Sequence, residues 1–164
     1  VEPVLYEGMP VSSTRIREAL GEGKMEEVAG MLGHPYTIRE RVAHGRALGR
    51  RLTFPTINQP LPESLRLPRF GVYASIAEVD GLRYPAVSNV GVKPTVGSGG
   101  PLCETYIIGY EDDLYDREVP VSLISFLRPE ERFESIEALR AQIEKDTERA
   151  RQIGLQRESL LQRD

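Results

Sequence analysis

The middle of the chain alternates apolar and polar positions with the period of two that is typical of β-strands. The clearest strand runs from Phe70 to Val79, and Asp80-Gly81 follows it as a two-residue hairpin turn. Further strands are predicted over 36–43, a short piece near Phe54, 82–90, 105–110 and 118–127. Because no helical segment alternates with them, we expect a mostly β fold whose six antiparallel strands close into a Greek-key-like β-barrel.

Helical spacing appears only near the two ends of the chain. Ser12 or Ser13 caps a first short helix that is predicted to end at Leu20, where Gly21 and Gly23 follow. A second runs over 25–32 before Gly33. Helices this short do not hold a core alone, so we interpret residues 1–33 either as the helical remnant of a larger unit or as an appendage that packs on the barrel.

One longer helix is predicted at the C-terminal end. Ser135 can cap it, and Gly154 is expected to end it. Its apolar positions recur at helical spacing; they are Ile136, Leu139, Ile143, Ala150 and Ile153. The predicted organisation is therefore a remnant over 1–33, a barrel with its helix over 34–155, and a polar tail over 156–164.

Composition narrows the possible functions. Apolar residues make up 40% of the 164 residues and charged residues 28%, which is typical of a soluble globular domain. A net charge of −4 argues against a protein that coats nucleic acid or anionic membrane. The single cysteine, Cys103, cannot form an internal disulfide and is expected to be a small core residue in a cytoplasmic protein.

Several common sites are absent from the sequence. There is no P-loop motif, no pair of histidines at metal spacing and no cysteine cluster for zinc. The segment 44–51 combines glycines with arginines, a composition that suits phosphate binding. A solvated basic loop explains this segment equally well.

Ten residues further on lies the segment 54–58. The Thr56 hydroxyl and the Asn58 amide oxygen are hard ligands of the kind that Mg²⁺ accepts together with phosphate oxygens. In an extended chain, residues two apart point the same way, so both can reach one ion. Taken by itself, the segment is more typical of a strand end.

Two later positions add candidate chemistry. Glu104, at the start of a predicted strand, is a candidate base for the proton of an attacking hydroxyl, although a lone strand glutamate is usually a surface residue. Arg128 and Phe133, between the last strand and the helix, could grip and stack on a flat polar ring. A solvated helix lead-in is the alternative there.

The order and spacing of short segments are more specific than any one of them. These segments are SSTRIR (12–17), LGHPY (32–36), HG (44–45), GR (49–50), FPTIN (54–58), GVYA (71–74), SNVGVKPT (88–95), ET (104–105), DLY (113–115) and FLRPE (126–130). Together they resemble the riboflavin kinase family, in particular the kinase module of bacterial bifunctional riboflavin kinase/FMN adenylyltransferases. The resemblance extends to about residue 154.

The resemblance implies a six-stranded antiparallel barrel and an ATP-dependent transfer that converts riboflavin into FMN and ADP. It implies that Thr56 and Asn58 bind Mg²⁺ and that Glu104 is the general base. It also implies two further sets of binding residues: Gly45, Arg50, Thr56 and Tyr115 for ATP, and Arg128, Glu131 and Phe133 for the flavin.

The resemblance also gives the N-terminal region a meaning. Residues 12–17 resemble the closing signature of the adenylyltransferase module, whose nucleotide-binding body would lie upstream of Val1. We therefore expect a fragment of a bifunctional FAD synthetase that does not make FAD, with the upstream module as its partner in the parent protein. Nucleic acid and membrane are not expected partners.

Four positions depart from the family pattern. Glu40, Thr53 and Asp116 stand where the family commonly has glycine, and Ile57 stands where it commonly has alanine. Thr53 and Glu40 put the affinity for ATP in question more than the type of reaction.

Two other functions stay open on the sequence. One is a non-catalytic flavin- or nucleotide-binding barrel, which the departures at Glu40 and Thr53 motivate. The other is a small RNA-binding barrel that uses Arg39, Arg41, Arg46, Arg50 and Arg51, against which the acidic net charge counts.

Overall fold

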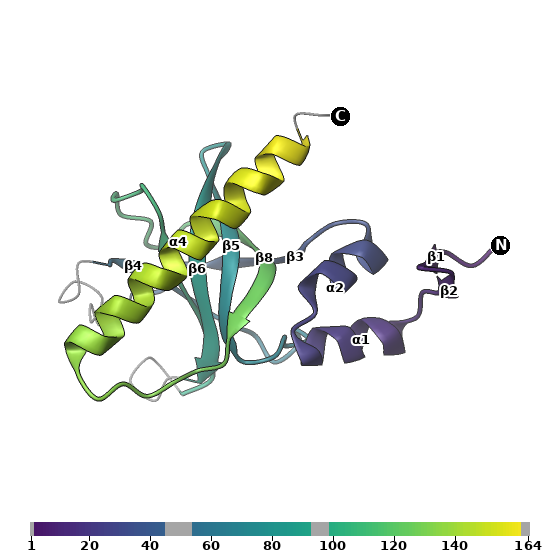
Figure 1. Ribbon diagram of the computed structural model, residues 1–164, viewed down its shortest axis with the longest axis horizontal. Coiled ribbons are helices and arrows are strands. Elements are labelled where there is room, and N and C mark those ends of the chain that lie inside the picture. Colours follow the sequence, from purple (N-terminus) through teal and green to yellow (C-terminus); the bar gives the residue numbers. More distant parts are fainter. Residues whose placement is uncertain (1, 45–53, 93–98, 162–164) are drawn as a thin grey trace.

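Six strands form one antiparallel sheet at the centre of the molecule (Figure 1). The structure is a computed structural model that describes residues 2–44, 54–92 and 99–161, with side chains as far as residue 157. The strands are β3 (Tyr36–Arg41), β4 (Thr56–Pro60), β5 (Gly71–Val79), β6 (Leu82–Val92), β7 (Pro101–Ile107) and β8 (Glu118–Arg128), in the order β3-β8-β5-β6-β7-β4. The prediction of a mostly β fold with six antiparallel strands is confirmed.

The sheet curls into a half-barrel, so that its two edge strands approach each other. The Ala43 amide donates a hydrogen bond of 2.7 Å to the Asn58 carbonyl, beyond the end of β3. The buried Gln59 side-chain amide donates to the carbonyls of Glu40 and Val119, each at 2.8 Å. These bonds connect β4 to β3 and β8. The expectation of a Greek-key-like closed barrel stays a prediction.

The β5–β6 hairpin has the turn that the sequence predicts. Asp80 and Gly81 have φ values of 51° and 79°, the left-handed conformations that a two-residue turn of this kind requires. This turn sets the register in which Gly71 pairs with Val90 and Val79 pairs with Leu82.

The concave face of the sheet holds the main core. Apolar side chains such as Ile38, Tyr73 and Val121 fill it together with Cys103. A row of three hydroxyls crosses it as well: Ser88 lies 2.8 Å from both Ser75 and Thr105. Each of these buried hydroxyls therefore has a partner, as burial of polar groups requires.

Helix α4 (Ile136–Leu161) crosses the opposite face of the sheet (Figure 1). A second apolar cluster, built on Val72, Ala74, Leu127 and Ala150, lies between helix and strands. As predicted, Ser135 caps the helix, accepting a hydrogen bond of 3.1 Å from the Ala138 amide.

The prediction that Gly154 ends this helix is wrong. The helix continues for seven more residues because Gly154 is a contact residue and not a cap: an added Cβ would lie 3.0 Å from the Cβ of Pro85. The glycine lets helix and β6 approach closely, so much of the expected polar tail is helical.

A buried ion pair anchors α4 to the sheet. The Arg128 Nη2 atom lies 2.9 Å from Asp146 Oδ2, and Arg128 Nε lies 3.0 Å from the same oxygen. The two side chains are only 13% and 1% exposed. Gln142 donates a further hydrogen bond to the Asp146 carboxylate at 3.0 Å, so this buried charge is well satisfied.

The N-terminal region adds two helices beside the sheet: α1 (Ser13–Glu22) and α2 (Met25–Leu32). Ser12 caps α1, but Gly21 does not break it, since Gly21 lies in an ordinary helical turn and Gly23 is the left-handed cap. A two-stranded hairpin of β1 (Leu5–Tyr6) and β2 (Met9–Pro10) precedes them and was not expected. The interpretation of residues 1–33 as a remnant stays a prediction.

The buried ion pair yields a prediction about stability. Asp146→Ala would leave the Arg128 guanidinium buried without its carboxylate, so we expect the free energy of unfolding to fall by about 3–5 kcal/mol. Glu148→Ala is the matched control on the same helix, because it breaks an exposed pair with Arg151 and should change stability by about 0.5 kcal/mol at most. Urea denaturation measures both, and equal losses would contradict the assigned importance of the buried pair.

Cys103 yields a prediction about pH. Burial raises the pKa of its thiol from 9.0 to about 11. The pKa of the thiol is higher in the folded than in the unfolded protein. Its contribution to the free energy of unfolding is therefore complete below pH 9 and is lost as pH rises towards 11. We expect urea denaturation across this range to show a steeper loss of stability for the wild type than for Cys103→Ala. Burial also raises the pKa values of Tyr36 and Tyr73, but the wild type and the Cys103→Ala variant both contain these tyrosines. An equal loss of stability with pH in the two proteins would refute the role given to Cys103.

Candidate active site

Strand pairing brings the predicted metal ligands and the predicted base together. In the β4–β7 register, Asn58 is directly opposite Glu104 and Thr56 is opposite Tyr106. Directly opposite residues of an antiparallel pair project to the same face, with Cβ atoms about 5 Å apart. Thr56 Oγ1 donates a long hydrogen bond of 3.4 Å to Glu104 Oε1, a residue 48 positions away in the sequence. Thr56, Asn58 and Glu104 therefore share one small area.

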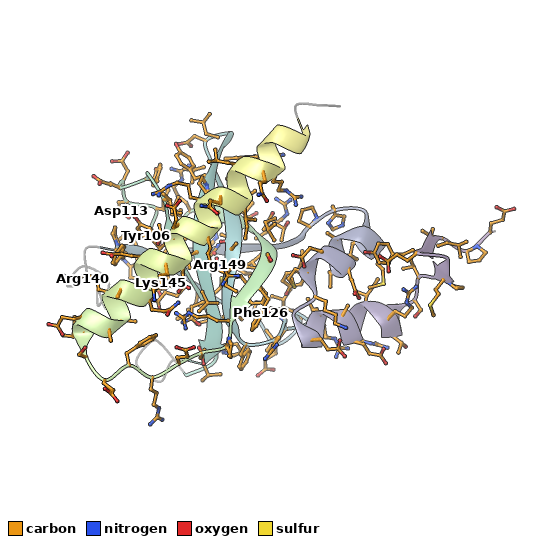
Figure 2. The ribbon with its side chains drawn as sticks, viewed as in Figure 1. Tyr106, Asp113, Phe126, Arg140, Lys145 and Arg149 are labelled. Carbon is orange, nitrogen blue, oxygen red and sulfur yellow. The ribbon has the colours of Figure 1, made fainter. Side chains whose placement is uncertain are left out.

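This area is on the face of the sheet that α4 crosses. Alternation places Glu104 and Tyr106 outside, whereas their neighbours Cys103 and Thr105 are buried in the concave core. In Figure 2, Tyr106 is labelled near the N-terminal half of α4, where Arg140 of that helix is also labelled. Thr56 and Glu104 are partly exposed, so a ligand can reach them.

The oxygen donors suit a magnesium ion that is shared with phosphate. Thr56 and Asn58 supply a hydroxyl and an amide oxygen, and Glu104 supplies a carboxylate beside them. Mg²⁺ typically takes few protein ligands and completes its octahedron with water and substrate phosphates. Within residues 2–44, 54–92 and 99–161, no group of three acidic, histidine or cysteine side chains could hold a metal ion.

Sequence reasoning missed Asn89, which extends the site onto β6. It is directly opposite Glu104 across the β6–β7 pair, so Glu104 is flanked by Asn58 on one side and Asn89 on the other. Its Oδ1 atom is buried and has no hydrogen-bond partner among the described residues. The signal that could have found it is a polar residue in the outward phase of a strand, between the buried neighbours Ser88 and Val90.

Arg128, predicted to hold the flavin, is in the same row of the sheet. Val72 pairs with Asn89 on one side and with Arg128 on the other, so the row runs Glu104, Asn89, Val72, Arg128. The Arg128 guanidinium carbon lies 5.5 Å from the centre of the Phe133 ring. Glu131 is exposed on the segment between β8 and α4.

Asp146, which holds Arg128, was also missed. The predicted helix stripe places apolar residues at 139, 143, 150 and 153, and Asp146 occupies the gap in that spacing. A lone carboxylate in an apolar stripe is a signal for a buried partner, and the partner is Arg128. The guanidinium is thereby fixed in place instead of being free in solution.

The predicted nucleotide residues are only partly described. Gly45 and Arg50 lie outside the described residues, as does Thr53. Tyr115 is stacked on His44 with ring centres 4.3 Å apart, and His44 Nε2 lies 3.1 Å from Asp116 Oδ2. Asp116 has φ 66°, the left-handed conformation that glycine adopts most easily, so its departure from the family pattern keeps the turn.

Comparison with known families agrees with this geometry. The family model described as "Flavokinase: Riboflavin kinase" matches residues 32–154, which include the whole sheet and most of α4. The chain belongs to the riboflavin kinase family. The match contains every predicted site residue of this riboflavin kinase domain.

Similar proteins are found among curated bacterial enzymes. The chain is 40% identical over 154 residues to the bifunctional riboflavin kinase/FMN adenylyltransferase of Pseudomonas fluorescens, covering 93% of this chain and 49% of that protein. It is 37% identical over 153 residues to the protein of the same name from Bacillus subtilis, covering 92% and 48%. The chain thus spans about half the length of the curated relatives it matches.

A solved structure from Streptococcus pneumoniae, described as a "Macrolide-efflux Protein", has the same fold. It superposes with a TM-score of 0.82 and 34% identity, covering 92% of this chain and 50% of that one. Within the described part of this riboflavin kinase domain, no helix is long and apolar enough to cross a bilayer.

Proposed function

We propose that this domain transfers the terminal phosphoryl group of ATP to the terminal ribityl hydroxyl of riboflavin and releases FMN and ADP. The observation that carries the proposal is the cluster of Thr56, Asn58 and Glu104 on one sheet face within a riboflavin kinase domain. Phosphoryl transfer needs mainly positioning and charge neutralisation from the protein, and this cluster offers both.

Glu104 acts as the base in this proposal. The acceptor hydroxyl attacks the γ-phosphorus, the bond from that phosphorus to the bridging oxygen of ADP breaks, and the hydroxyl proton passes to the Glu104 carboxylate. The neighbours of Glu104 on both adjacent strands are neutral amides, Asn58 and Asn89.

Thr56 and Asn58 would hold Mg²⁺ through their side-chain oxygens. When bound, the ion neutralises the negative charge of the ATP phosphates. The hydrogen bond from Thr56 to Glu104 is long at 3.4 Å, so a hydroxyl that turns to a metal gives up little. Gly45, Arg50 and Tyr115 complete the proposed nucleotide site.

The flavin ring would bind where Arg128 and Phe133 meet, with Glu131 beside them. Asp146, which itself accepts a hydrogen bond from Gln142, fixes the guanidinium, so the cation is already oriented before any ligand arrives. A preorganised planar cation next to an aromatic ring suits a flat, polar ring system.

The N-terminal segment, residues 1–33, concerns the second activity that the relatives carry in name. The relatives carry an adenylyltransferase function in name and are about twice as long as this chain. We interpret residues 1–33 as the end of such a module. The reducing cytoplasm is the proposed setting.

The decisive measurement is FMN formation from riboflavin, ATP and Mg²⁺, followed by chromatography. Glu104→Gln should keep flavin binding and lose about a hundredfold or more in turnover, because it removes the proton acceptor without changing the shape. Glu78→Gln on the exposed face of β5 is the matched control and should leave turnover unchanged. Flavin binding by the wild type without any FMN would favour a non-catalytic flavin-binding barrel instead.

The metal site has its own test. Thr56→Val removes a ligand oxygen while keeping the side-chain volume, so the Mg²⁺ concentration at half-maximal rate should rise about tenfold or more. Thr37→Val removes a hydroxyl on β3, whose partners are Pro35 and Ser122, and should leave this concentration unchanged. An unchanged Mg²⁺ requirement in Thr56→Val would remove Thr56 from the metal site.

A further inference from the structure

Asn89 has a buried oxygen that nothing in the described chain satisfies. An unpartnered buried acceptor costs about 1–3 kcal/mol, and native proteins keep few of them. The other unpartnered side-chain oxygen of this kind in the described residues, on Gln59, faces the concave core, whereas Asn89 is on the face that carries the site. The Asn89 oxygen is therefore a candidate for contact with a ligand.

The position of Asn89 says which part of a ligand it meets. The predicted metal ligands are on β4, beyond Glu104 as seen from Asn89, and the Arg128–Phe133 contact lies in the opposite direction. Neighbouring strands are about 4.8 Å apart, so Asn89 is about one strand spacing from Glu104 and two from Arg128. A ligand that joins a flat ring near Arg128 to a hydroxyl at Glu104 must pass over β6.

The neighbours of Asn89 on this face present an aliphatic group, a glycine and carboxylates. Across β5 the next residue in the row is Val72, and two residues along β6 on the same face is Gly91. A side chain at Gly91 would overlap the carboxyl group of Glu130, so this carboxylate lies against Gly91, two residues from Asn89. Asn89 thus has an aliphatic neighbour on β5 and a carboxylate neighbour on β7, surroundings that suit the carbon backbone and the hydroxyls of a polyol.

We propose that Asn89 binds the polyol chain of the acceptor. Its Oδ1 accepts a hydrogen bond from a ribityl hydroxyl, and this bond directs the terminal hydroxyl of the same chain to Glu104. The inference rests on the proposed function and deepens it, because it assigns the discrimination between flavins with and without a polyol chain to one residue. Asn89 is a substrate-binding residue in this account and takes no part in proton transfer.

The test compares two flavins by fluorescence quenching, in the absence of ATP. Riboflavin carries the polyol chain, and lumiflavin has a methyl group in its place. Asn89→Leu should weaken riboflavin binding about tenfold and leave lumiflavin binding unchanged, since one hydrogen bond is lost. Asn89→Asp keeps the acceptor oxygen and should retain the preference for riboflavin. Ser88→Ala, on the opposite face of the same strand, should lower stability without changing the preference.

Each outcome decides the proposal separately from the kinase activity. Unchanged riboflavin affinity in Asn89→Leu overturns it, even if the wild type makes FMN. Equal weakening of both flavins also overturns it and would make Asn89 a structural residue. A changed Mg²⁺ requirement with unchanged flavin binding would assign the oxygen to the metal instead. If the wild type binds riboflavin in preference to lumiflavin through Asn89 but makes no FMN, the polyol contact stands and the proposed transfer fails.

Discussion

The register of β4, β7 and β6 is the constraint on which the rest of this site depends. Asn58, Glu104 and Asn89 face one another only because these strands pair as they do. Side chains alternate along a strand, so a slip of one residue would send Glu104 into the core and Cys103 to the surface. The packing of the buried phase of these strands therefore fixes the reactive groups of the exposed phase.

Two sets of polar contacts hold the paired strands in the curled sheet and hold α4 against it. Gln59, one residue beyond Asn58, closes the curled sheet through its bonds to Glu40 and Val119. Asp146 holds Arg128 and with it the helix that crosses the site-bearing face. Both are buried side chains in otherwise apolar surroundings, where a misplaced partner would leave an unsatisfied group. Specific geometry, more than apolar area, is what these two contacts contribute.

Much of the fold could be predicted from the sequence because strand alternation and turn residues are local signals. The Asp80-Gly81 turn and the strand before it follow directly from their composition. The errors came from glycines whose meaning depends on distant residues. Gly154 has the composition of a helix end, but its lack of a side chain serves the contact with Pro85, which is 69 positions earlier. No local pattern contains that information.

The sequence by itself determined most strands of the six-stranded sheet, the long helix, the family resemblance and the identity of Thr56, Asn58 and Glu104 as candidate groups. These depend on residue type and spacing along the chain. Only the tertiary structure decided that Asn89 stands beside Glu104, that its oxygen lacks a partner among the described residues, and that Arg128 is held by Asp146. Pairing between strands and burial beneath a helix arise from contacts between distant segments, and such contacts exist only once the sheet has curled and α4 has packed on it.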